Sequence, residues 1–235
     1  MPVQMYTQPG HAGYWRKVWA IAAKDLRAEV RAKEVLGTMI AFGLLAVVVF
    51  GLAFDLRVPQ GAMVAPGVLW GVILFAGVLG LHRSFGAEMD RHTLPALLLA
   101  PVDRSAIYFG KFLAQFVFLA AAVVVIAPAV VVIFNVNVLQ GWIPVGLLLG
   151  LIGYTGVGTL FGALTAGIRA RESMLPILLM PVMAPVFMAG IGLTANVLDG
   201  RTFVDFRHWL LLLGIYDVVF LTIAYLVFDM IWEDS

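Results

Sequence analysis

The 235-residue sequence contains no cysteine. This absence excludes disulfide bonds, thiolate metal sites and covalent haem attachment through a Cys-x-x-Cys-His motif on this chain. Charged residues are also scarce, because they make up only 12% of the chain, about half of their share in an ordinary soluble domain. A Gly-x-x-x-x-Gly-Lys-Ser/Thr motif is missing as well, so we expect no nucleotide site of that kind.

Catalytic and metal-binding patterns are missing too. The four histidines show no metal-ligand spacing, and no acid–base set is visible: His11, His82, His92 and His208. We therefore predict no catalytic residues, no metal site and no enzyme that acts alone.

Long apolar runs are what the sequence does contain. Apolar residues make up 62% of the chain and come in runs of about 20, the length that a helix needs to cross ~30 Å of hydrocarbon. Backbone groups in lipid must be hydrogen-bonded internally, so these runs are predicted to be helices. The predicted fold class is an all-α polytopic membrane protein, a six-span domain over residues 35–235. The spans are expected at about 36–54, 64–81, 107–134, 142–166, 174–197 and 209–231.

The N-terminal region precedes these spans. Residues 1–13 lack periodicity and are predicted to be a flexible tail. Residues 14–34 have helical periodicity, with Trp15 and Trp19 on an apolar face and basic residues mostly elsewhere. This pattern is typical of an amphipathic helix in the plane of the membrane interface, although a solvated charged helix is the alternative.

The distribution of Lys and Arg predicts the orientation. If the N-terminus is cytoplasmic, inner segments hold all but three of the 15 Lys and Arg residues, the exceptions being Arg57, Arg201 and Arg207. By the positive-inside rule, both termini are expected in the cytoplasm.

The segment at residues 82–105 is the longest polar interruption between spans. It carries six charges (Arg83, Glu88, Asp90, Arg91, Asp103 and Arg104) and an apolar stripe (Phe85, Met89, Leu94, Leu97 and Leu98). A segment of this composition on the cytoplasmic side is suited to docking a soluble partner.

Three of the predicted spans have unusual features. The fourth carries small residues that let another helix approach closely: Gly146, Gly150, Gly158, Gly162 and Ala166. We favour packing inside the monomer over a subunit interface. The fifth contains Pro176, Pro181 and Pro185, which predict a bent helix that either moves, lines a cavity or is a static packing element.

The sixth predicted span contains an acidic residue, Asp217. An intramembrane acid usually faces the bundle interior or water. We predict a structural polar contact, hydrogen-bonded by side chains such as Tyr154 or Thr155, over a possible role as an intramembrane polar site for a substrate.

One region carries a specific resemblance. Residues 75–85, Glu88, residues 97–108 with Pro101-Val102-Asp103-Arg104-Ser105, and Gly110-Lys111 resemble the signature region of CcmB. That family comprises permease subunits of the haem exporter in bacterial cytochrome c maturation. The likeness extends from about Trp15 to the proline-rich fifth span.

The resemblance implies an ABC-2 type permease of the bacterial inner membrane, with an interfacial N-terminal helix and a coupling helix between the second and third spans. It further implies a homodimer that works with the ATPase CcmA, with CcmC and CcmD, and with the haem chaperone CcmE. ATP and Mg would then be bound by the partner ATPase, haem would be handled by the complex, and this chain alone would bind no cofactor.

On this basis residues 83–104 are predicted to couple the permease to the ATPase. The charged residues would contact polar groups of the ATPase: Arg83, Glu88, Asp90, Arg91, Asp103 and Arg104. The apolar residues would fill a groove on the ATPase: Phe85, Met89, Leu94 and Leu97. Two alternatives stay open: an ABC-2 exporter of another substrate, such as a drug or a polysaccharide lipid, and a non-transporting scaffold that transmits ATPase motion.

Overall fold

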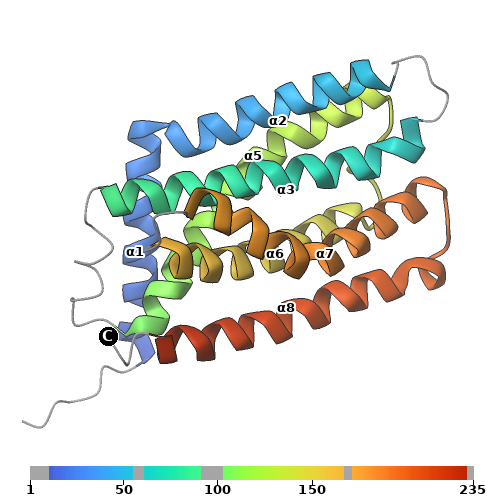
Figure 1. The fold of residues 1–235 in the computed structure, drawn as a ribbon. Helices are drawn as coiled ribbons and strands as arrows, with labels where there is room; N and C mark the ends of the chain where they lie inside the picture. The colour runs from blue at the N-terminus through green and yellow to red at the C-terminus, as the bar shows by residue number, and fades with distance from the viewer. Residues whose placement is uncertain (1–10, 55–60, 91–102, 167–170, 232–235) are drawn as a thin grey trace, which may run out of the picture.

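A computed structural model describes residues 11–54, 61–90, 103–166 and 171–231. Helices account for the secondary structure of these ranges: α1 (His11–Ala32), α2 (Glu34–Ala53), α3 (Gly61–Asp90), α5 (Arg104–Phe134), α6 (Ile143–Ala166), α7 (Arg171–Leu198) and α8 (Phe203–Ile231). Helices α2, α3 and α8 run roughly parallel to one another, and α5 crosses the bundle obliquely behind α3 (Figure 1).

Six of the described helices are long and apolar enough to cross a membrane, which confirms the predicted fold class. The candidate spans are Glu34–Ala53, Gly61–Phe85, Arg104–Phe134, Ile143–Thr165, Met174–Leu198 and Phe203–Val227. Helix α5 has 31 residues, or about 46 Å at ~1.5 Å per residue. It is therefore longer than the hydrocarbon layer of ~30 Å, and its ends extend toward the polar boundary.

Two helix boundaries differ from the sequence expectation by more than one helical turn. The second span was predicted to end near Leu81, but α3 continues to Asp90. The sixth was predicted to begin near Trp209, but α8 begins at Phe203. In both places charged or polar residues continue the helix, because only hydropathy, and not helix geometry, changes at the edge of an apolar run.

Helix α1 crosses one end of the bundle at a steep angle (Figure 1). The corner between α1 and α2 lies at Lys33, whose backbone is left-handed (φ 54°). Glu29 stabilises this corner, because its Oε1 accepts a hydrogen bond of 2.7 Å from the backbone N–H of Leu36. Such a bond satisfies one of the amides that have no partner in the first turn of a helix.

Helix α6 uses its small residues inside the monomer, as predicted. A Cβ added at Gly146 or Gly150 would overlap Leu193 or Trp70, and one at Gly158 would overlap Leu81. Each glycine therefore marks a point where a side chain of another helix rests directly on the α6 backbone. Small residues permit this close approach, which supplies dispersion contacts where lipid offers no hydrophobic driving force.

Trp70 on α3 is the largest fully buried side chain of the described core. Its ring lies against Gly150 of α6 and Gly190 of α7. The indole Nε1–H donates a 3.0 Å hydrogen bond to the hydroxyl of Thr194 on α7. Trp70 thus joins three helices, and its polar atom has the partner that a buried indole needs.

The three prolines of the fifth span lie inside one helix, α7, which remains continuous from Arg171 to Leu198. The helix changes direction along its length (Figure 1). A proline cannot donate the intrahelical hydrogen bond, so carbonyl groups near it need other partners. Helix α8 contacts this proline-rich part of α7, because the hydroxyl of Tyr216 donates a 2.9 Å bond to the carbonyl of Val182.

Candidate functional site: the junction of α1 and α5

The crossing point of α1 and α5 is Gly110. A Cβ added there would lie 2.7 Å from Cβ of Ile21 and 3.0 Å from the carbonyl oxygen of Val18. Both residues belong to α1, and both are buried. The missing side chain at Gly110 therefore allows the α1 backbone to lie directly on α5.

One residue further along α5, a buried ion pair joins the same two helices. The Nζ atom of Lys111 lies 2.9 Å from Oδ2 of Asp25, and the exposed fractions of the two side chains are 3% and 11%. Lys24 also approaches Asp25, at 3.1 Å, from a side chain that is 48% exposed. Removing one member of such a buried pair is costly, because the other charge loses both water and its counter-ion.

Phe85 on α3 completes this cluster. The Lys111 Nζ atom lies 5.9 Å from the centroid of the Phe85 ring, within the range of a cation–π interaction. The Phe85 ring also lies against Gly162 of α6. Helices α1, α3, α5 and α6 therefore meet around one buried ammonium group.

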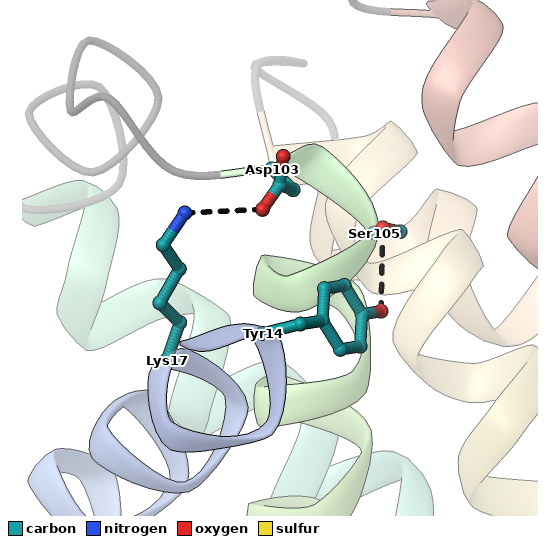
Figure 2. Close-up of polar contacts among 4 residues, drawn as sticks. All are labelled: Tyr14, Lys17, Asp103 and Ser105. Atoms are coloured by element: carbon teal, nitrogen blue, oxygen red, sulfur yellow. Dashed lines mark hydrogen bonds and ion pairs between the residues drawn. The ribbon is translucent and has the colours of Figure 1, made fainter. Parts of the chain in front are cut away.

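The first turn of α5 is held by a second set of contacts from α1, shown in Figure 2. The Nζ atom of Lys17 lies 3.1 Å from Oδ2 of Asp103, and the hydroxyl of Tyr14 donates a 3.3 Å bond to Oγ of Ser105. Asp103 occupies the N-cap position of α5 but makes no side-chain capping bond. Its carboxylate is directed to α1 instead, while its backbone carbonyl accepts the first helical bonds from Ala106 and Ile107.

These contacts define what we call the α1–α5 junction: Tyr14, Lys17, Asp25, Phe85, Asp103, Ser105, Gly110 and Lys111. It connects the helix that lies across the end of the bundle to the start of a membrane-spanning helix. Apolar contacts, ion pairs and a hydrogen bond join the two helices within the same few turns.

The residues predicted to couple to an ATPase differ in their exposure and in whether the structure describes them. Arg83 is exposed on α3, and Asp103 is about half exposed but already pairs with Lys17. Arg104 is partly buried, and its Nη1 has no hydrogen-bond partner among the described residues. Glu88, Met89 and Asp90 lie in the last turn of α3, whereas Arg91, Leu94 and Leu97 fall outside the described residues.

Phe85 corrects one prediction. It was expected to fill an apolar groove on a partner protein, but its exposed fraction is only 4%. The ring is occupied by contacts inside this chain, with Lys111 and Gly162. Amphipathic patterning alone could not show this, because an apolar residue beside a polar segment is equally suited to a partner's groove and to the protein's own core.

Asp217 on α8 corrects a second prediction. It is buried, as expected, but neither carboxylate oxygen has a hydrogen-bond partner among the described residues. The hydroxyl of Tyr154 donates to the carbonyl of Leu74, and that of Thr155 to the carbonyl of Leu151. Asp217 instead packs against Gly153 of α6, so its contact is one of close packing.

The sequence argument missed the role of Lys111 and of its partner Asp25. A signal was present, because Lys111 is a single cation at the start of the long apolar run of α5, and a buried cation requires an anionic partner. No group of three or more potential metal ligands occurs among the described residues.

Comparisons with known proteins bear on the chain as a whole. The model of the family described as "CcmB protein" matches residues 16–230. The chain is 32% identical over 187 residues to "Heme exporter protein B" of Rhodobacter capsulatus, covering 77% of this chain and 84% of that protein. Proteins of the same name from Pseudomonas aeruginosa and Escherichia coli are each 26% identical, over 81% and 72% of this chain and 86% and 78% of theirs.

Proposed function

Because the chain belongs to the CcmB protein family, we propose that it is the membrane permease subunit of an ABC transporter in cytochrome c maturation. It is a multi-pass protein of the bacterial inner membrane, and its relatives are named haem exporters. Its substrate class in this proposal is haem, handled by a complex of several subunits, in which this chain forms a homodimer.

The proposed mechanism couples ATP hydrolysis in a partner chain to movement of the spans. The partner is the ATPase CcmA, which binds ATP and Mg, while CcmC, CcmD and the haem chaperone CcmE complete the assembly. Turnover then drives haem export or the release of the haem-loaded chaperone. In this proposal the bundle end with α1, the end of α3 and the start of α5 faces the cytoplasm, in agreement with its excess of Lys and Arg.

The observation that carries the coupling proposal is the α1–α5 junction. Some residues predicted to contact the ATPase are close to it in the chain: Asp103 is part of the junction, Arg104 follows Asp103 at the start of α5, and Arg83 lies two residues before Phe85 on α3. A force applied there reaches α1 through Lys17 and Tyr14, and reaches α3 and α6 through Lys111 and Phe85. The bent helix α7 then carries the movement toward the opposite end.

Charge reversal tests this proposal. We expect Glu88→Lys and Arg104→Glu each to reduce co-purification of the ATPase, or to leave ATP hydrolysis without cytochrome c maturation. Arg201→Glu is the matched control, because Arg201 is exposed between α7 and α8 at the opposite end of the bundle. Normal assembly and normal maturation in both test variants would contradict a coupling role.

The identity of the complex is tested by purifying the tagged chain in detergent and identifying the subunits that accompany it. A small P-loop ATPase together with a haem-bearing partner supports the cytochrome maturation assembly. An ATPase without haem proteins supports an exporter of another substrate. Retention of both, with no haem movement across reconstituted membranes, supports a scaffold that only transmits ATPase motion.

A further inference from the structure

An open groove of about 590 Å³ lies between α2 and α3, at the end of the bundle that carries α1. It is lined by Lys33, Glu34, Gly37, Thr38, Ala41, Phe42, Leu45, Leu79 and Arg83. The ATPase-coupling proposal uses one residue of this lining, Arg83, but gives the groove itself no occupant.

The polar end of the groove carries an excess of positive charge. Lys33 and Arg83 are exposed, and neither makes an ion pair with another described residue. Glu34 is the one acidic residue of the lining, so the net charge of the lining is +1. The two basic side chains come from different sides of the groove, Lys33 from the residue before α2 and Arg83 from α3.

The remainder of the groove is mostly apolar, and the whole groove has about the length of one membrane leaflet. Its α2 wall runs from Lys33 to Leu45, about 18 Å at ~1.5 Å per residue. Half of the ~30 Å hydrocarbon layer is about 15 Å. Phe42, Leu45 and Leu79 line this part, so a chain that extends from the basic end meets apolar side chains along its length.

Gly37 provides the space in the wall of the groove. A Cβ added at this position meets no atom within 4 Å. By contrast, a Cβ added at Gly43 on α2 would overlap Ile126, and one added at Gly80 on α3 would overlap Met39. The surface at Gly37 is therefore open, because no side chain of the described structure rests on it.

We propose that this groove binds one acidic glycerophospholipid, with the headgroup phosphate between Lys33 and Arg83 and an acyl chain along Gly37, Ala41 and Leu45. A headgroup of net charge −1 neutralises the lining, whereas a zwitterionic headgroup leaves the charge of +1 uncompensated. The groove is a direct continuation of the leaflet, so a lipid enters it sideways without leaving the membrane. The site goes beyond ATPase coupling, although it shares one residue, Arg83, with that proposal.

Native mass spectrometry of the full chain, purified with the subunits it retains, tests the proposal. Nanodiscs would contain phosphatidylglycerol, phosphatidylethanolamine or phosphatidylcholine, and the readout is the number of lipids that survive delipidation. We expect one phosphatidylglycerol to be retained. Lys33→Gln with Arg83→Gln should weaken its binding about 25-fold, or about fivefold for each charge removed.

Two further variants separate the groove from general surface charge. Gly37→Leu places a side chain in the groove at a position where an added Cβ meets no atom within 4 Å, and it improves helix propensity, so it should displace the lipid from a chain that still folds. Arg201→Gln with Arg207→Gln removes two exposed cations from the opposite end and should leave retention unchanged.

Three outcomes would overturn the proposal. Equal losses in the Lys33/Arg83 and the Arg201/Arg207 variants would show ordinary annular lipid. Equal retention of phosphatidylethanolamine would show that the acidic headgroup is not recognised. Haem, or a second copy of this chain, retained in place of lipid and lost with Gly37→Leu would assign the groove to that occupant instead.

Discussion

Gly110 offers the sharpest test of how α1 is held. We predict that Gly110→Ala displaces α1, because the new Cβ would lie 2.7 Å from Cβ of Ile21 and 3.0 Å from the backbone oxygen of Val18. Ordinary van der Waals contacts lie at about 3.5–4.0 Å, so α1 must move by about 1 Å. The end of a flexible side chain could yield at little cost, but a Cβ and a backbone oxygen cannot.

The expected magnitude is the difference between two opposing effects. Overpacking of a well-packed contact costs about 1–3 kcal/mol, whereas Gly→Ala in a helix interior gains about 1 kcal/mol. Gly71→Ala in α3 is the matched control, because its added Cβ meets nothing within 4 Å. This variant therefore gains helix propensity without the cost of overpacking. The stability of Gly110→Ala should therefore lie about 1–3 kcal/mol below that of Gly71→Ala.

Two measurements read out this prediction. Thermal unfolding in detergent should place the Gly110→Ala midpoint below that of the control, at about 2–4 °C per kcal/mol for a chain of this size. Hydrogen exchange of the α1 amides should be faster in Gly110→Ala alone, since the same 1 Å displacement strains the Asp25–Lys111 pair. Gly110→Val should enlarge both effects.

The result that refutes the reasoning is specific. If Gly110→Ala and Gly71→Ala raise stability equally, and α1 exchange is unchanged, then α1 does not rest on the α5 backbone. Junction coupling would then lose its structural basis, even if the family membership stands.

Three further predictions concern buried polar side chains. Asp25→Asn should lower the free energy of unfolding by about 3 kcal/mol or more. Lys111→Met should lower it by less, because the Asp25 carboxylate that remains still has Lys24 nearby and is the more exposed member of the pair. Equal losses in a double-mutant cycle would contradict this asymmetry. Trp70→Phe should lower the free energy of unfolding by about 1–3 kcal/mol, since it removes the hydrogen bond to Thr194 and leaves a cavity. An unchanged midpoint of thermal unfolding would show that Trp70 does not stabilise the three-helix contact. Asp217→Asn should leave stability equal or raise it by up to about 2 kcal/mol, because neither carboxylate oxygen is hydrogen-bonded, whereas a loss above 1 kcal/mol would reveal a hidden partner.

Sequence reasoning was most accurate where a property belongs to a single segment. The six spans follow from apolar length alone, and the prolines of α7 indicated its bend. The small residues of α6 predicted close helix approach, and Gly146, Gly150 and Gly158 each receive a side chain from a neighbouring helix. What the sequence could not supply was the identity of those neighbours, such as Trp70.

The errors have a common cause, which is that they concern pairs. Phe85 was directed to a partner protein because its position beside a polar segment resembles a docking stripe, yet it lies under Lys111. Asp217 was paired with Tyr154 or Thr155 because they are polar, yet those hydroxyls bond to carbonyl groups of the backbone.

The tertiary structure alone decides which face of each helix is buried. On α5, Val130 is fully buried while Val132 is 79% exposed, although both are the same residue type in one apolar run. In water such a difference would appear as amphipathic periodicity, because the exposed face must be polar. In lipid both faces are apolar, so composition determines that a helix spans the membrane, while close packing and a few buried polar pairs determine its rotation and its neighbours.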